Sequence, residues 1–187
     1  TLLNSAEKIK NFSILAPKEQ NYVYGEDQYI NHDKNKRYHK MKFITGCALL
    51  FKMSSLNKTG HFDENIFLYY EEHDLYHRCL KLGLDIYLID DAKFKHYGTS
   101  STDSNYNQEI YLNRNWHYCW SKFYYFKKNY SYFYGIKKTM PNLLRALRKY
   151  IFSTITRDSK NSTLHLAELQ GLFSSYLLKK STRRPKM

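Results

Sequence analysis

The chain has 187 residues, which is enough for one domain with its own core or for a domain with an appended segment. A hydrophobic fraction of 42% and an aromatic fraction of 17% exclude an intrinsically disordered chain. The net charge is +13, and residues 121–187 supply all of it, because their 15 Lys and Arg face only Asp158 and Glu168. The first 120 residues are neutral, so the charge indicates two parts with different roles.

Two further properties narrow the class of protein. No apolar run approaches the roughly 20 residues of a transmembrane helix, and the N-terminal residues lack the apolar core of a signal peptide. The three cysteines, Cys47, Cys79 and Cys119, are widely separated and form no CxxC pair. Their spacing indicates neither a zinc site nor a disulfide framework, and a reducing compartment is the simplest interpretation.

The first half of the chain predicts strands separated by polar segments. Residues 12–17 have the pattern of a short buried strand that ends at a proline. Residues 18–40 are polar and mostly without periodicity, so a long loop is expected there. The continuous apolar run 43–51 predicts a strand covered on both faces. A short helix is expected to follow from an N-cap at Ser54 or Ser55, with a break at Gly60 and a turn over 61–65.

The next segments alternate helix and strand. Residues 71–82 place Leu75, Cys79 and Leu82 on one face of an amphipathic helix, and Gly83 is suited to the position after it. Residues 85–89 predict a strand, with 92–96 as an extended continuation. This order predicts an α/β fold for the first part of the chain.

The last third predicts three helices, over residues 107–128, 136–152 and 163–178. The second is amphipathic, with an apolar stripe and with Lys and Arg largely on its other side. We expect the stripe to pack on the domain or on the helix 163–178, while the charges remain available to phosphate-rich surfaces. The stripe contains Ile136, Met140, Leu143, Leu144, Leu147 and Ile151.

Three carboxylates, Glu71, Glu72 and Asp74, open the helix 71–82. Acidic side chains in a first helical turn are favoured by the exposed N–H groups and the helix dipole. Asp74 also forms an i,i+4 pair with Arg78, which adds only a few tenths of a kcal/mol, roughly. By spacing alone, a capping role is therefore favoured over a catalytic one.

The surroundings of these carboxylates resemble a known family. The sequence TGHFDENIFLYYEEHDL at 59–75 resembles the GFDE…F.Y.ED.DL signature of bacterial family 2 glycosyltransferases, especially the rhamnosyltransferase-like group. The similarity covers roughly residues 9–130. It continues in the same order through Arg78, Gly83, the strand 85–89, His96, Gly98, Ser100 and Ser101, and through a Y..RN element at Tyr111, Arg114 and Asn115.

The resemblance implies an α/β fold of the GT-A type. Residues 1–106 would be the acceptor-side half of the catalytic domain, and residues 107–187 would be a basic region of C-terminal amphipathic helices. The nucleotide-binding βαβ half, which ends in a D-x-D motif in such enzymes, has no counterpart in these 187 residues. We therefore expect the chain alone to be an inactive fragment that binds nucleotide-sugar weakly.

The resemblance also implies the chemistry. It is an inverting transfer of a sugar from a nucleotide-sugar to a hydroxyl of a glycan or lipid-linked glycan, in the synthesis of cell-surface polysaccharide. A carboxylate takes the acceptor proton, and a divalent cation, Mg²⁺ or Mn²⁺, neutralises the departing diphosphate. Glu72 matches the position of the base, which is usually Asp in the family. Glu71 and Asp74 would orient the base and the acceptor, or cap the helix.

Two further residues have both a functional and a structural interpretation. His96 corresponds to a histidine that contributes to the metal shell in some members of the family, and a hydrogen-bonded histidine at a strand end is the alternative. Arg114 is a candidate for contact with the donor diphosphate, with a helix-surface arginine as the alternative. His73, His77 and His117 are interpreted as structural or solvent-exposed.

The basic last third suits an anionic membrane surface. The family resemblance implies action at the inner leaflet, so we expect a cytoplasmic protein with peripheral attachment to the inner membrane face. A nucleic-acid-binding module is the rival class, because this region is both basic and aromatic. Against it, the first 120 residues are neutral and no RNP, KH or helix-turn-helix pattern occurs, so no specific nucleic-acid partner is expected. A catalytically dead interaction domain is the third alternative.

Overall fold

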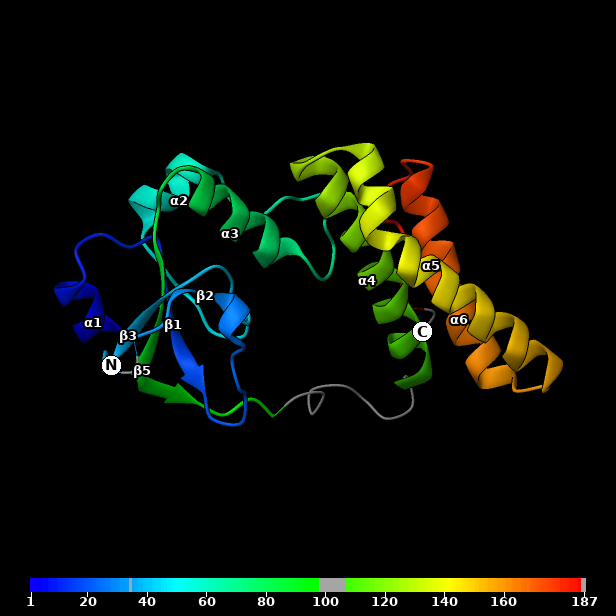
Figure 1. Cartoon of the computed structure of the whole chain (residues 1–187), viewed down its shortest axis with the longest axis horizontal. Coiled ribbons are helices and arrows are strands. Elements are labelled where there is room, and N and C mark those ends of the chain that lie inside the picture. Colours follow the sequence, from blue (N-terminus) through cyan, green and yellow to red (C-terminus); the bar gives the residue numbers. More distant parts are fainter. Residues whose placement is uncertain (34, 98–106, 186–187) are drawn as a thin grey trace. The chain divides into compact units, whose positions relative to one another are not determined.

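A computed structural model describes residues 1–33, 35–97 and 107–185. It is a mixed α/β structure with a five-stranded mixed sheet and, within the described residues, six α-helices (Figure 1). The chain forms two compact units, one of residues 1–62 and 72–100, the other of residues 63–71 and 101–187. Gly98, Ser100 and Ser101, which contribute to the family resemblance, lie outside the described residues.

The sheet belongs to the first unit, and its central strand pairs in parallel with one neighbour. Ile14 and Leu15 of that neighbour pair with Ile86 and Tyr87 of the central strand. The neighbouring pairs are antiparallel. Three of these residues are fully buried, which explains why continuous apolar runs form the centre of the sheet. The strand order is β2 (Tyr29–Asn31), β3 (Tyr38–Met41), β5 (Ile86–Phe94), β1 (Ile14–Glu19) and β4 (Leu50–Phe51).

Three helices complete the first unit: α1 (Leu2–Lys8), α2 (Met53–Thr59) and most of α3 (Glu71–Lys81). The buried face of α3 carries Leu75, Tyr76 and Cys79, which join the sheet residues Ile14 and Ile86 in one hydrophobic cluster. The expected amphipathic helix is therefore confirmed, with one correction: Leu82 lies beyond its end and is 55% exposed, so it does not join the buried face. Gly83 follows it with a φ of +69°, a left-handed conformation that glycine adopts without steric cost.

The segment 18–40 is not a simple loop, and that prediction was wrong. It contains a short 3₁₀ helix, η1 (Glu26–Gln28), and the strands β2 and β3. The strand β3 escaped recognition because its inward side chain at 39 is a histidine. His39 is 4% exposed, and its Nε2 lies 3.0 Å from Asp90 Oδ2, so a polar pair takes the place of an apolar contact.

The predicted strand 43–51 is also much shorter than expected. Only Leu50 and Phe51 pair in the sheet, as β4. Ile44 is buried in the core, whereas Gly46 and Cys47 are exposed in a turn. The apolar run 43–51 therefore includes loop residues that pack against the core, and only its last two residues form a strand. In contrast, the two extended segments 85–89 and 92–96 correspond to one strand, β5.

The second unit is built from three helices: α4 (Asn107–Asn129), α5 (Tyr132–Ile155) and α6 (Ser159–Tyr176), which contact one another pairwise (Figure 1). Trp116, Trp120 and Leu172 are buried among them. Gly171 allows α6 to approach α4 closely, since a Cβ atom there would collide with the carbonyl oxygen of Trp116. All three helices were predicted, with α5 longer at both ends than expected.

The apolar stripe of α5 does not pack as predicted. Met140, Leu144, Leu147 and Ile151 are exposed, and Ile136 and Leu143 are half-buried. The buried side of α5 instead consists of small residues, Gly135, Thr139, Ala146 and Ser153, which bring the helix close to its neighbours. None of the helices in the described ranges is both long and apolar enough to cross a membrane.

Candidate functional site

Glu72 lies at the second position of α3 and is only 20% exposed. Its Oε1 lies 3.7 Å from His73 Nδ1, and its Oε2 is buried without a hydrogen-bond partner among the described residues. Burial alone would raise the pKa of Glu72, but His73 and the backbone N–H of Glu72 itself hold it below its ordinary value. The carboxylate is therefore ionised at neutral pH, and one of its oxygens is buried with its hydrogen-bonding capacity unused among the described residues.

The turn at Gly46 and Cys47 lies directly against Glu72. A Cβ atom at Gly46 would be 3.4 Å from both Cγ and Cδ of the Glu72 side chain. Burial raises the pKa of the Cys47 thiol, and the negative charges of Glu19 and Glu72 raise it further. Cys47 is therefore a protonated thiol within electrostatic reach of two carboxylates.

His96 lies beside Cys47 and Glu19 in the same unit. Its Nδ1 is 3.6 Å from Cys47 Sγ and 3.6 Å from Glu19 Oε1. Each of the three residues offers one potential ligand atom, and these three atoms lie within 4.8 Å of one another. Three elements supply them: Glu19 ends β1, Cys47 lies in the turn before β4, and His96 follows β5.

The chemistry of these three donors can be compared with the cations that the family resemblance implies. Mg²⁺ is held mainly by oxygen atoms, and this set offers one carboxylate. An imidazole with a carboxylate suits Mn²⁺ as well, and a thiolate favours softer cations such as Zn²⁺. The set therefore fits Mn²⁺ better than Mg²⁺, and binding through Cys47 would require loss of the thiol proton.

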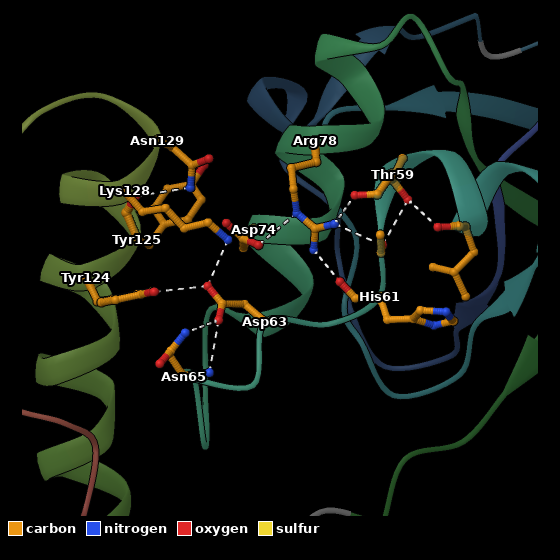
Figure 2. Close-up of polar contacts among 12 residues, drawn as sticks. Thr59, His61, Asp63, Asn65, Asp74, Arg78, Tyr124, Tyr125, Lys128 and Asn129 are labelled. Atoms are coloured by element: carbon orange, nitrogen blue, oxygen red, sulfur yellow. Dashed lines mark hydrogen bonds and ion pairs between the residues drawn. The ribbon is translucent and has the colours of Figure 1, made fainter.

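Asp74 is fully buried and pairs with Arg78, which in turn holds the loop 59–61 (Figure 2). Its Oδ2 accepts a hydrogen bond of 2.9 Å from Arg78 Nε. The other nitrogens of Arg78 donate to the carbonyl oxygens of Thr59, Gly60 and His61, at 2.5, 2.9 and 2.7 Å. The Asp74–Arg78 pair thus fastens the loop 59–61 to α3. Glu71, the third carboxylate, is half-buried at the first position of α3.

In the second unit, Asp63 is the centre of another network, also visible in Figure 2. Its Oδ2 accepts hydrogen bonds from Lys128 Nζ at 2.8 Å and from the Tyr124 hydroxyl at 3.1 Å. Its Oδ1 accepts from the backbone and side-chain nitrogens of Asn65, at 2.9 and 2.8 Å. Burial opposes ionisation, yet these donors lower the pKa of Asp63 to about 2. The acidic residue of the GFDE-like motif therefore anchors its own loop to α4.

Arg114 lies in the second unit and donates from Nε to the Tyr69 hydroxyl at 2.7 Å. Tyr69 and the following Tyr70 have φ values of +64° and +69°, a left-handed conformation that is strained for aromatic residues. The strain falls immediately before Glu71 and Glu72, at the start of α3. His117, by contrast, is fully buried, and its Nε2 lies 2.9 Å from the carbonyl oxygen of Arg183, as a structural histidine would.

Each unit also has a cavity. In the first unit, a cavity of about 490 Å³ borders Glu19 and is otherwise lined mainly by charged side chains, among them Lys18, Arg37, Asp90 and Asp91. In the second unit, a cavity of about 560 Å³ is lined by Trp120, Tyr124 and basic residues of the C-terminal segment. Glu19 therefore belongs both to the three-donor cluster and to a polar hollow.

Sequence reasoning singled out Glu72 and His96 but missed Glu19 and Cys47. The sequence patterns predict a loop at Glu19 and a strand at Cys47. A signal existed for Cys47, because the adjacent Gly46 interrupts an apolar run, as a turn residue does. No family model matches the chain, and neither a curated protein nor a solved structure shows significant similarity to it.

Proposed function

We propose that this chain carries the acceptor-side part of an inverting glycosyltransferase with a GT-A fold, and that Glu72 is its catalytic base. One observation carries the proposal. Glu72 is ionised and largely buried, one of its oxygens has no partner among the described residues, and the turn 46–47 joins it to three potential metal ligands. A base and a cation-binding group at one place are what transfer from a nucleotide-sugar requires.

The reaction proceeds by direct displacement. An acceptor hydroxyl donates a hydrogen bond to the Glu72 carboxylate, whose side chain is 20% exposed. The hydroxyl oxygen forms a bond to the anomeric carbon, Glu72 takes the proton, and the bond to the nucleoside diphosphate breaks with its electron pair on phosphate oxygen. The low pKa of Glu72 keeps it in the basic form at neutral pH. Glutamate in place of the family's usual aspartate requires the acceptor to lie one methylene further from the helix.

The other residues hold or position groups. Glu19, Cys47 and His96 would hold a divalent cation, which supplies charge neutralisation for the leaving diphosphate when bound. Asp74 and Arg78 position the loop 59–61 and the first turn of α3. Arg114, fixed by Tyr69, is the candidate for contact with a phosphate group of the donor.

The substrates proposed are a nucleotide-sugar donor and a hydroxyl of a glycan or lipid-linked glycan. The proposed location is the cytoplasm, at the inner membrane face. The asymmetry of the charge supports this choice, because the excess of Lys and Arg lies in residues 121–187 and suits the phosphates of an anionic membrane surface.

The test is substitution of Glu72 in the natural full-length protein. Glu72→Gln removes the base while keeping size and polarity, so turnover should fall by at least about 100-fold, the usual contribution of a general base. Nucleotide affinity should remain unchanged, because donor contacts persist. Glu72→Asp should retain part of the activity. Turnover and nucleotide binding are measured with radiolabelled donor sugar and by calorimetry.

Glu7→Gln is the matched control, since Glu7 is an exposed glutamate of the first unit, on α1. Its turnover should equal that of the unmodified protein. Turnover of Glu72→Gln near that of the control would remove Glu72 from the role of base.

A further inference from the structure

The helix α5 has a large apolar face that the fold does not use. Phe133, Leu144 and Ile155 are 83%, 60% and 74% exposed. They recur at helical spacing with three other exposed side chains, so all six project from one side of the helix. We call this set the apolar face of α5; it consists of Phe133, Met140, Leu144, Leu147, Ile151 and Ile155.

The opposite side of α5 already anchors the helix to its unit. Gly135, Thr139, Ala146 and Ser153 are buried there, against α4 and α6. The Thr139 hydroxyl lies 2.9 Å from the Tyr176 hydroxyl of α6, and Ser131 caps the start of α5 by accepting from Tyr134 N–H. Packing therefore fixes α5 without the apolar face, and six large exposed apolar side chains on one stripe mark a binding surface.

Positive charge flanks this face. The 24 residues of α5 contain five Lys and Arg and no Asp or Glu. Arg145 pairs with Glu168 of α6 at 2.9 Å. Lys137, Arg148 and Lys149 are exposed, and among the residues that the structure describes they make no ion pair. Three cations of α5 thus lack an anionic partner; by helical spacing Lys137 and Arg148 border the apolar face, and Lys149 lies further round the helix.

We propose that the apolar face of α5 and its flanking cations bind the surface of an anionic phospholipid membrane. The helix would lie in the plane of the interface, with its apolar side chains among the acyl chains and its cations at the phosphates. The long stems of Lys137 and Arg148 let their charges reach the headgroups. Charge complementarity selects this occupant, because a second copy of the chain would bring the same cations face to face.

The inference names the surface behind the proposed location at the membrane face, and it does not depend on the proposed transferase activity. A purely acidic protein partner would satisfy the cations but would leave the apolar face in water. A neutral apolar groove would cover the face but would leave the cations unpaired. An anionic membrane would bury the apolar face and pair the cations at the same time. Each cation near an anionic surface raises the affinity for the membrane about fivefold.

The test is co-sedimentation of the 187-residue chain with vesicles. Binding to vesicles of equal parts phosphatidylcholine and phosphatidylserine should be strong, and binding to pure phosphatidylcholine should be weak. The triple variant Lys137→Gln, Arg148→Gln, Lys149→Gln should bind the anionic vesicles roughly 100-fold more weakly. The double variant Leu144→Gln, Ile151→Gln should lose roughly tenfold or more, since each glutamine removes apolar area from the contact.

Matched controls separate this face from charge and hydrophobicity in general. Lys8→Gln, Lys58→Gln, Lys81→Gln makes the same change in net charge at exposed lysines of the first unit. Leu3→Gln with Leu177→Gln removes two leucines that are each 66% exposed and lie outside the apolar face of α5. Both controls should bind like the unmodified chain, and circular dichroism should show that every variant keeps its helix content.

Three results would overturn the proposal. Equal loss of binding in the charge variant and its control would show that net charge alone acts. Equal binding to both vesicle types would remove the role of anionic lipid. A dimer in light scattering that dissociates on Leu144→Gln, Ile151→Gln, without vesicle binding, would assign the face to a second copy of the chain.

Discussion

Two carboxylates with lowered pKa values, Glu72 and Asp63, differ in what their oxygens contact. Both oxygens of Asp63 accept hydrogen bonds from neighbouring side chains or backbone within the second unit. Glu72 has one oxygen without such a partner in the described part of the chain. A carboxylate whose oxygens are all hydrogen-bonded stabilises the fold. A buried carboxylate oxygen without a hydrogen bond costs free energy of folding, and a role in binding or catalysis explains why such a group is present.

The network around Asp63 predicts a dependence of stability on acid. Its pKa falls from 3.8 to about 2 on folding, so the unfolded chain binds the proton more readily. The resulting stabilisation, roughly 2 kcal/mol, should be fully present above the unfolded pKa and lost as the pH falls through the folded pKa. Chemical denaturation at neutral pH and at successively lower pH values measures it.

Asp63→Asn isolates this contribution. The variant should be less stable than the unmodified chain by roughly 2 kcal/mol at neutral pH, and the difference should shrink as the pH approaches 2. Glu64→Gln, at the adjacent exposed carboxylate, is the control and should leave the pH dependence of the unfolding free energy unchanged. A constant difference at every pH would mean that packing, and not ionisation of Asp63, stabilises the loop.

Single residues show where sequence reasoning ended. Glu72 and His96 were singled out because they match, in the same order along the chain, the sequence signature described above. Glu19 and Cys47 join them only through the sheet: parallel pairing of β1 with β5 brings Glu19 opposite Phe94, two residues before His96. That register depends on a pairing between residues 75 positions apart, which local periodicity does not encode.

The helices were predicted more accurately than the strands. Their apolar residues repeat over many turns, and glycine or a capping residue marks their ends, as Gly83 does for α3. The strands β2 and β4 have three and two residues, too few for alternation to register. The prediction that the apolar stripe of α5 packs on the protein was wrong for another reason. Periodicity shows that a helix face is apolar, but it does not show what covers that face.

The crossing of α4 and α6 gives a prediction about one glycine. Alanine normally stabilises a helix relative to glycine by about 1 kcal/mol. At Gly171 the sign should reverse, because the new Cβ atom would collide with the backbone carbonyl oxygen of Trp116, which a rotamer change cannot relieve. Gly171→Ala should therefore destabilise the unit by about 1–3 kcal/mol, as measured by urea denaturation.

The neighbouring residue provides the control for that experiment. Gln170 is exposed on the same helix, so Gln170→Ala should leave stability unchanged within about 0.5 kcal/mol. If Gly171→Ala were as stable as Gln170→Ala, then α4 and α6 would lie further apart than the structure places them.

At the scale of the whole chain, charge is distributed unevenly. Residues 121–187 contain 15 of the 30 Lys and Arg but only two of the 17 acidic residues. Their carboxylates, Asp158 and Glu168, are both engaged: Asp158 caps α6 through Asn161, and Glu168 pairs with Arg145 and His165. The remaining cations repel one another, and this repulsion opposes folding of the helices. The sequence alone revealed this asymmetry, since it needs only a count along the chain.

Repulsion between like charges predicts that added salt stabilises the protein. At low ionic strength the Debye length is about 30 Å, so the cations along α5 act on one another, whereas at 0.1 M it is about 10 Å. The midpoint of thermal unfolding, followed by helical circular dichroism, should therefore rise as NaCl is added. Weakening of ion pairs such as Lys128–Asp63 works in the opposite direction, but that pair is largely buried and less exposed to screening.

The variant Lys137→Gln, Arg148→Gln, Lys149→Gln makes this argument specific. With three cations removed from one helix, the unfolding midpoint at low salt should be higher than that of the unmodified chain, and it should rise less on adding NaCl. The variant Lys8→Gln, Lys58→Gln, Lys81→Gln lowers the net charge equally but leaves the cations of α5 in place, so it should keep the larger rise. The same rise in both variants would mean that the effect comes from total charge, and a fall in the midpoint with salt would mean that attraction dominates. The expected pattern makes the cations of α5 a source of instability in the fold, which is consistent with their retention for an anionic surface.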